Sequence, residues 1–257
     1  MADFDLRSAD LRALNSLTKY PSIPTYHELD PRNGGLTESV TAFPGPVLGT
    51  EKVDGTNSRL IMLPGGDYLI GSREELLLAR GDLIGNPSQG IVAALRAVAD
   101  ALPDQQLPAD TLRVYFLELY GGKIGAQAKQ YSTRGAVGWR LFDVAEVPDL
   151  AERLTWPAER IAAWRDGGGQ SFATEDALQA VTDFELTPRL FTVDGADLPA
   201  DVAGMHAFLG ERLPETLVAL DDSGQRRAEG IVLRSPDRSV IAKARFQDYE
   251  RTLKRRG

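Results

Sequence analysis

The order of apolar and polar residues along the chain predicts a mixture of strands and helices. Residues 59–63 and 68–72 are apolar runs on either side of a proline- and glycine-containing turn at 64–67, and they predict a β-hairpin. Near the start, residues 5–17 place leucines at helical spacing and predict a short amphipathic helix. The clearest helix covers residues 88–102, with an apolar stripe made of Ile91, Val92, Leu95, Val98 and Leu102.

Further strands follow along the chain. Residues 113–120 and 137–144 are strongly apolar and predict two strands, and residues 227–234 and 239–245 predict a last hairpin before a basic C-terminal helix. The stretch 149–213 has a more helical pattern. Because hairpins are mixed with helices, rather than strands alternating with helices, we expect an α+β fold of mostly antiparallel sheets flanked by helices.

The composition excludes several kinds of site. There is no cysteine, so disulfides, thiolate zinc sites and cysteine nucleophiles are excluded. His27 and His206 are too few for a histidine-rich metal site, whereas a magnesium site built on carboxylates remains open. No long apolar run and no signal peptide is visible, so we expect a cytoplasmic protein without a membrane span, folded as one domain over residues 1–257.

The charge of the chain is unevenly distributed. The net charge of −8 argues against a general nucleic-acid coat. From Lys243 to the end, however, there are six basic and two acidic residues. Charge alone does not decide between two interpretations of this basic tail. Either it binds a phosphate chain, or it is the solvated end of a helix, where positive charges interact favourably with the helix dipole.

Lys52 is the most informative residue of the sequence. It is one of six lysines against twenty-three arginines, and it lies in the run EKVDGTN at 51–57, just before an Asp-Gly turn signal. Unlike arginine, lysine can lose its proton near neutral pH and attack phosphorus or carbon. Such a nucleophile needs nearby positive charge or desolvation, carboxylates for a metal, and an aromatic ring for a base.

The rest of the chain supplies these groups beside the predicted strands. Glu118 is an acid inside the apolar strand 113–120, and Glu229 begins another apolar strand. Lys243 and Arg245 are two residues apart, which places them on one face of a strand. The other candidates at strand ends are Arg73, Phe142 and Asp143.

Together these motifs resemble those of the covalent nucleotidyltransferases, the superfamily of ATP-dependent ligases and RNA capping enzymes. The run EKVDGTN is similar to the first motif of the nick-sealing RNA ligase family, in which a glutamate precedes the lysine. Later motifs are matched at 116–121 (FLELYG), 229–232 (EGIV) and 243–245 (KAR), and the family's opening at 20–23 (YPSI). Leu117 and Arg245 depart from the family pattern, which has glycine and lysine there.

The resemblance implies a nucleotidyltransferase (adenylyltransferase) fold, ATP-grasp-like, and the activity of an ATP-dependent RNA ligase. It covers residues 19–245 and is weakest between 146 and 228; each motif is common by itself, and their order carries the resemblance. The implied reaction forms a lysyl-AMP at Lys52 from ATP, with magnesium, or manganese in its place, as the metal. The AMP then activates a 5′-phosphate RNA end for attack by a 3′-hydroxyl.

The same resemblance assigns roles to individual residues. Lys243 and Arg245 join Lys52 as catalytic residues that hold the α-phosphate; their ordinary reading is charge that blunts an edge strand. The residues implied in nucleotide binding are Glu51 at the adenine amino group, Asn57 at a metal-bound water or a phosphate, Arg73 at the ribose or a phosphate, Glu118 at a ribose hydroxyl or hydrated magnesium, Phe142 stacked on adenine, and Lys243. The implied metal set is Asp143, Glu229 and Glu118. The ordinary readings are a surface acid for Glu51, a turn residue for Asn57, a hairpin-end charge for Arg73 and a core ring for Phe142.

Two other functions remain open from the sequence. One is a minimal ATP-dependent DNA ligase, and the other is a nucleotide- or RNA-binding module without catalysis. Twelve residues follow Arg245, so we expect no C-terminal oligonucleotide-binding (OB) or helical domain. RNA with 5′-phosphate and 3′-hydroxyl ends is then expected to be engaged by the basic residues 251–256, or through an RNA-binding protein partner.

Overall fold

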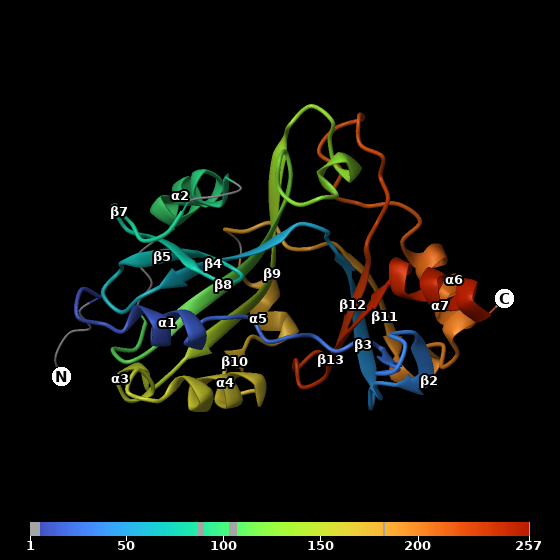
Figure 1. The fold of residues 1–257 in the computed structure, drawn as a ribbon, viewed down its shortest axis with the longest axis horizontal. Helices are drawn as coiled ribbons and strands as arrows, with labels where there is room; N and C mark the ends of the chain where they lie inside the picture. Colours follow the sequence, from blue (N-terminus) through green and yellow to red (C-terminus); the bar gives the residue numbers. More distant parts are fainter. Residues whose placement is uncertain (1–5, 87–89, 103–106, 182, 257) are drawn as a thin grey trace.

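Two antiparallel sheets lie side by side in the computed structural model, which describes residues 6–86, 90–102, 107–181 and 183–256 (Figure 1). The larger sheet has seven strands in the order β10-β9-β8-β4-β5-β6-β7, and the smaller has four in the order β11-β3-β12-β13. All neighbouring strands in both sheets pair antiparallel. The prediction of an α+β fold with mostly antiparallel sheets is confirmed.

The larger sheet is apolar on both faces. Its strands are β4 (Thr56–Met62), β5 (Tyr68–Ser72), β6 (Leu76–Ala79), β7 (Asp82–Leu83), β8 (Leu112–Gly121), β9 (Val137–Val147) and β10 (Ser171–Phe172). The neighbours Leu60 and Ile61 on β4 belong to different core clusters: Leu60 clusters with Leu95 of α2, and Ile61 with Leu14 of α1 and Ile161 of α4. Since strand side chains alternate between faces, helices on both sides explain the unbroken apolar run at this strand. The helices of this half are α1 (Leu11–Leu17), α2 (Ile91–Ala101), α3 (Leu150–Arg153), α4 (Ala158–Asp166) and α5 (Glu175–Gln179).

The smaller sheet is covered on one face only. Its strands are β3 (Pro46–Lys52), β11 (Arg189–Asp194), β12 (Gly230–Arg234) and β13 (Ile241–Arg245). Ile231 and Leu233 of β12 pack into a core cluster with Val202 of α6 (Val202–Arg212) and Tyr249 of α7 (Phe246–Arg256). The alternate positions of β12 and β13 line a pocket on the other face, as described below. The remaining elements are the hairpin β1 (His27–Leu29) and β2 (Leu36–Val40) and the short 3-10 helices η2 (Ala128–Gln130) and η3 (Gly195–Asp197).

The chain crosses from the smaller to the larger sheet between β3 and β4 (Figure 1). This connection is the segment Val53-Asp54-Gly55, which begins directly after Lys52. A Cβ at Gly55 would overlap the carbonyl oxygen of Leu119 on β8, so only glycine lets the turn lie this close to the larger sheet. The glycine of the first motif therefore places Lys52 at the boundary between the sheets.

Most of the predicted elements are present. The hairpin at 59–72, the strands at 113–120 and 137–144, the last hairpin and the closing helix are confirmed. The first helix begins only at Leu11, because Asp10 caps it by accepting from the amides of Arg12 and Ala13, and residues 1–5 lie outside the described residues. The helix predicted over 88–102 is α2, although 88 and 89 also lie outside the described residues. The stretch 149–213 holds helices α3 to α6, as expected, but also two strands: β10 forms an edge of the larger sheet and β11 an edge of the smaller one.

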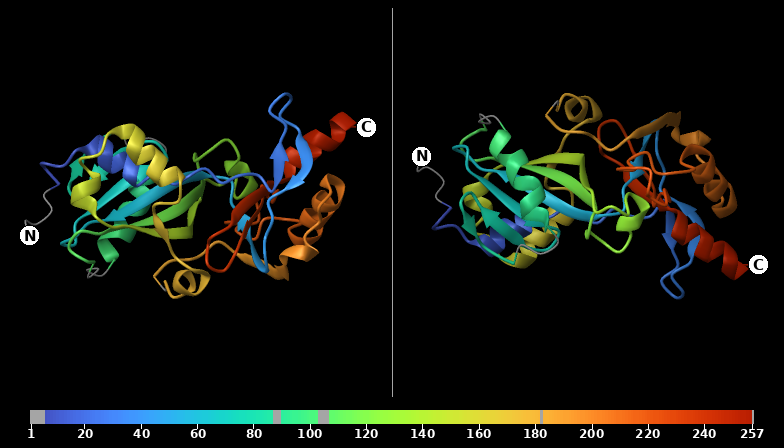
Figure 2. Two further views of the ribbon diagram at one scale, coloured as in Figure 1. Left: turned by 90° about the horizontal axis from the view of Figure 1, so that it is seen from below. Right: turned by 90° about the horizontal axis from the view of Figure 1, so that it is seen from above.

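Arginines of the basic C-terminal helix form hydrogen bonds within the fold. Arg251, Arg255 and Arg256 of α7 donate to backbone carbonyl oxygens of the loop and strand at 33–36, so they fasten the β1–β2 hairpin. Figure 2 shows this hairpin beside α7 at one end of the molecule, away from α1 and α2. The reading in which these arginines hold RNA is therefore not favoured. Within the described residues, no helix has the length and apolar character needed to cross a membrane.

Candidate active site

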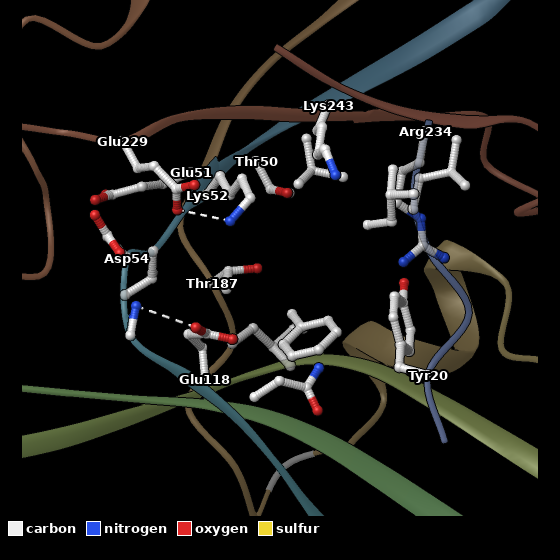
Figure 3. A pocket seen from close by; sticks show the side chains of 18 of the residues that line it. Tyr20, Thr50, Glu51, Lys52, Asp54, Glu118, Thr187, Glu229, Arg234 and Lys243 are labelled. Atoms are coloured by element: carbon white, nitrogen blue, oxygen red, sulfur yellow. Dashed lines mark hydrogen bonds and ion pairs between the residues drawn. The ribbon is translucent and has the colours of Figure 1, made fainter. Parts of the chain in front are cut away.

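A cavity of about 440 Å³ lies between the two sheets, and residues from both sheets line it (Figure 3). Strands β3, β12 and β13 of the smaller sheet and the crossover turn contribute many of its walls, and β4, β8 and β9 of the larger sheet add Thr56, Asn57, Glu118 and Phe142. The segment 20–23, residues of α5, Arg73 and residues 186–187 also line it. The motifs that resembled an RNA ligase, which are spread over more than two hundred residues, therefore meet at one cavity.

Lys52 ends β3 and points into this cavity (Figure 3). Its Nζ lies 2.6 Å from Oε2 of Glu229, which precedes β12, and the two side chains are 25% and 16% exposed. The antiparallel register explains the meeting, because Lys52 pairs with Gly230, the residue after Glu229. Burial raises the pKa of the Glu229 carboxyl, and the Lys52 charge opposes that rise.

Lys243 and Arg245 are both in the pocket but differ in their partners. Arg245 donates to both carboxylate oxygens of Asp248, over 2.8 and 3.2 Å, so its charge is already paired. The Lys243 ammonium forms no hydrogen bond or ion pair with any residue in the described ranges. Burial, together with the charges of Arg245 and Lys52, lowers the pKa of Lys243. Lys243 is therefore the cation best placed to receive an anionic ligand.

Glu118 and Asn57 stand opposite each other on β8 and β4 and both line the pocket. One oxygen of Glu118 accepts a hydrogen bond of 3.1 Å from the amide of Gly55, which ties the crossover turn to β8. Burial raises the pKa of Glu118 to about 8, against the opposing charge of Lys52. Asn57 Oδ1 is buried and has no hydrogen-bond partner among the described residues, which marks it as an acceptor for a ligand.

Glu51 lines the pocket, but its carboxylate is already bonded within the protein. It alternates with Lys52 along β3, and its two carboxylate oxygens accept from the Thr216 hydroxyl and, over 2.8 Å, from the Leu217 amide. Glu51 is 1% exposed, and it fastens the segment after α6 to the smaller sheet. Both oxygens are in use, so this geometry does not support the expected contact with an adenine amino group.

Asp143 does not line the pocket, so the structure does not support its predicted role as a metal ligand. It is fully buried, and one carboxylate oxygen accepts from the Tyr20 hydroxyl at 2.9 Å and from Arg238 Nε at 2.8 Å. The other oxygen accepts from the Val144 amide and lies 3.7 Å from Arg234 Nη1. The register between β8 and β9 shifts at Phe142, and Phe142 and Asp143 both contact Tyr20. Only Phe142 lines the pocket, because the Asp143 carboxylate is enclosed by its hydrogen-bond partners.

Phe142 and Arg73 reach the pocket in different ways. The Phe142 ring meets the Tyr20 ring edge to face, with the centroids 5.1 Å apart and an angle of 85° between the planes. Arg73 lies at the rim, where its side chain is 66% exposed and pairs loosely with Glu74 at 3.6 Å. Phe142 is thus held in place, whereas Arg73 is free to reorient.

Several lining residues were not among the candidates from the sequence. These are Thr50, Gln179, Thr187, Val232 and Arg234. Thr50 and Val232 were identifiable in principle, because they lie two residues from Lys52 and from Gly230 and so share the pocket face of their strands. The segment that brings Gln179 and Thr187 is held by a backbone hydrogen bond from Glu51 to Pro188, a distant contact that no local pattern reports.

The acidic residues of the pocket suit a metal only in part. Among the described residues, no three acidic or histidine side chains gather closely enough to hold a metal by themselves. Glu118 and Glu229 do line the same cavity. Magnesium usually binds through one or two carboxylates together with substrate phosphates and water, so these two carboxylates fit a metal that is shared with a nucleotide.

Comparison with known proteins agrees with this geometry. A sequence model of the RNA ligase family matches residues 45–254. No curated protein sequence matches the chain. Solved structures of a Naegleria gruberi RNA ligase are similar to this chain. A ligand-free variant is 14% identical with a TM-score of 0.59, and the match covers 99% of this chain and 60% of that chain. The ligase with pyrophosphate is 14% identical with a TM-score of 0.57, over the same shares of the two chains.

A variant of the same ligase with ATP and Mn is similar at 13% identity and TM-score 0.59, over 99% of this chain and 61% of that chain. At such identity the likeness shows the fold alone, which is the nucleotidyltransferase fold. The chain spans about 60% of the length of these ligases. Because the family match covers most of the chain, from before Lys52 to beyond Arg245, the chain belongs to the RNA ligase family.

Proposed function

We propose that this chain is an ATP-dependent RNA ligase in which Lys52 becomes covalently adenylated. The observation that carries the proposal is the Lys52 ammonium inside the cavity between the sheets, 2.6 Å from Glu229 and in the same cavity as Lys243. The cavity volume of about 440 Å³ is in the range of small-molecule sites. A nucleophile, a base and a free cation in one enclosed site are what transfer of an AMP group requires.

The walls of the cavity suit each part of a nucleotide. Phe142 comes from the larger sheet and Val232 from the smaller one, so a planar base between the sheets meets an apolar group from each side. Asn57 Oδ1 and Glu118 offer acceptors for ribose hydroxyls. Lys243 offers a positive charge for the α-phosphate. Each contact uses a group that the fold itself leaves available.

The first chemical step transfers AMP to the protein. Glu229, whose pKa burial raises, accepts a proton from Lys52. The Lys52 amine then attacks the α-phosphorus of ATP and forms an N–P bond, while the bond to the bridging oxygen breaks and pyrophosphate leaves with the electron pair. Lys243 stabilises the negative charge that develops on the α-phosphate oxygens. Arg245 contributes mainly by holding Asp248, because its guanidinium is already paired.

The later steps complete the ligation. A 5′-phosphate oxygen of an RNA end attacks the phosphorus of lysyl-AMP and releases Lys52, which gives an adenylated RNA end. A 3′-hydroxyl then attacks the 5′-phosphate and AMP leaves. Bound Mg²⁺ or Mn²⁺ would neutralise phosphate charge in these steps, held by Glu229 or Glu118 together with the phosphates.

The first step is tested by intact-protein mass spectrometry after incubation with ATP and Mg²⁺. The expected result is a gain of one AMP group, mapped to the peptide that contains Lys52. Lys52→Arg is the sharpest variant, because it keeps a cation beside Glu229 but removes the nucleophile. Lys123→Ala, which removes an exposed lysine, serves as the matched control and should load normally. AMP that persists in Lys52→Arg, or no AMP in the unmodified protein, refutes the mechanism.

The acceptor is tested separately with nicked duplexes. One duplex is entirely DNA, and another carries RNA on the 3′-hydroxyl side of the nick. We expect sealing of the RNA-containing nick only, because the 2′-hydroxyl distinguishes the two strands. Equal sealing of both would favour a DNA ligase, and nucleotide binding without pyrophosphate release would favour a binding module.

A further inference from the structure

The buried cluster around Asp143 is not used by the proposed chemistry. Three side chains form a closed triangle: Tyr20 donates to Asp143 over 2.9 Å, Arg238 Nε donates to Asp143 over 2.8 Å, and Arg238 Nη2 donates to the Tyr20 oxygen over 2.9 Å. The Asp143 and Arg238 side chains are only 1% and 9% exposed. Burial and the Asp143 charge raise the pKa of Tyr20, so its hydroxyl stays protonated and keeps donating.

The three members come from three separate parts of the fold. Tyr20 follows α1, Asp143 lies on β9 of the larger sheet, and Arg238 lies in the turn between β12 and β13 of the smaller sheet. The triangle therefore connects the two sheets at a point beside the cavity that separates them. Figure 3 shows Tyr20 on the side of the cavity opposite Lys52.

Arg238 is held in an unfavourable backbone conformation. Its φ is +64°, in the left-handed region that residues other than glycine and asparagine seldom adopt. Its guanidinium also lies 4.1 Å from the centre of the Phe172 ring on β10, in addition to its two hydrogen-bond partners. Contacts on several sides thus offset the cost of this conformation, as is common where a residue has a functional role.

The triangle reaches the cavity through the Tyr20 ring. This ring packs edge to face against Phe142 and also against Phe116, with centroids 5.1 and 4.8 Å away. Tyr20 and Phe142 both line the cavity, whereas Phe116 is fully buried beneath them. Fixing the Tyr20 hydroxyl therefore fixes the orientation of the aromatic wall against which a base would lie.

We propose that Tyr20, Asp143 and Arg238 form a clamp that holds the base-binding end of the cavity and the spacing of the two sheets there. They are positioning residues: they set nucleotide affinity without touching the reacting phosphates. This inference rests on the proposed function, because the nucleotide is the ligand whose affinity the clamp sets. The predicted metal role of Asp143 is replaced by this one.

The test compares two tyrosine variants that each lose one hydrogen bond to an aspartate. Tyr20→Phe keeps the ring contacts and removes the hydroxyl. Tyr68→Phe is the matched control, because the buried Tyr68 donates to Asp100 over 2.6 Å and does not line the cavity. For AMP loading, we expect Tyr20→Phe to raise the KM for ATP about tenfold with kcat within about twofold. Tyr68→Phe should leave both unchanged.

A second measurement does not depend on catalysis. Amide hydrogen exchange of the nucleotide-free protein should accelerate at 18–24 and 235–240 in Tyr20→Phe, and not in Tyr68→Phe. Equal effects of the two variants, or unchanged exchange in Tyr20→Phe, would overturn the clamp. If the unmodified protein loads no AMP, the proposed function fails, and the exchange measurement still decides whether the triangle links the sheets.

Discussion

Glu118 makes the stability of the nucleotide-free protein depend on pH. Burial raises its pKa from 4.5 to about 8, so the folded protein keeps a proton that the unfolded chain has already lost. A rise of about 3.5 corresponds to at most about 5 kcal/mol, at about 1.4 kcal/mol per pKa unit. Glu118 borders the cavity and is only partly shielded from solvent, so we expect about half of this value.

The sign of the effect follows from proton linkage. A carboxyl whose pKa is raised in the folded protein makes its full favourable contribution to the free energy of unfolding below pH 4.5, which is its pKa in the unfolded chain. That contribution is lost as the pH rises toward about 8. The Glu118→Gln variant carries no titrating proton at this site. The free energy of unfolding of the unmodified protein, relative to the variant, should therefore fall by about 2 kcal/mol between about pH 5 and pH 8.

Urea unfolding without nucleotide, at several pH values in that window, measures this difference. Glu211→Gln on α6 is the control, because it removes a carboxylate from an exposed position. The reasoning from burial is refuted if the free energy of unfolding of the unmodified protein, relative to Glu118→Gln, stays constant or increases as the pH rises.

Three further predictions concern the turn, a buried arginine and the free lysine. Gly55→Ala places a Cβ on the Leu119 carbonyl oxygen, so urea unfolding should show a loss of about 1–3 kcal/mol; unchanged stability would contradict the close approach. Arg59→Met leaves the carbonyl oxygens of Ser72 and Asn15 without their donor, so we expect a loss of about 3 kcal/mol that Arg59→Lys does not restore; restoration by lysine would show that charge alone matters. Lys243→Ala should slow AMP loading about 10²- to 10³-fold in a pyrophosphate-release assay, and the unfolding temperature should barely change. A normal loading rate would show that Lys243 has no role in the mechanism.

Local patterns in the sequence determined most of the elements and the identity of the site. The first-motif turn shows why: Lys52 precedes an Asp-Gly pair, and the glycine is required by the close approach of Gly55 to β8. Glu118, Glu229 and Lys243 were identified by charge within apolar strands, where an ionised group needs a partner or a ligand. All three line the cavity with Lys52. Charge in apolar strands marked them as candidates, and the order of the motifs in the family resemblance joined them into one site.

Tertiary structure alone decided which charged groups are already satisfied. Asp143 and Glu51 looked like ligand-binding acids beside Phe142 and Lys52, but their partners Arg238 and Thr216 lie 95 and 165 residues further along the chain. The same holds for the basic tail, whose arginines bind carbonyl groups of a hairpin near the start of the chain. A sequence pattern reports spacing along a strand or helix, whereas a hydrogen-bond partner depends on how distant segments pack. The sequence therefore located the chemistry, and the packing of the two sheets determined which side chains are free to perform it.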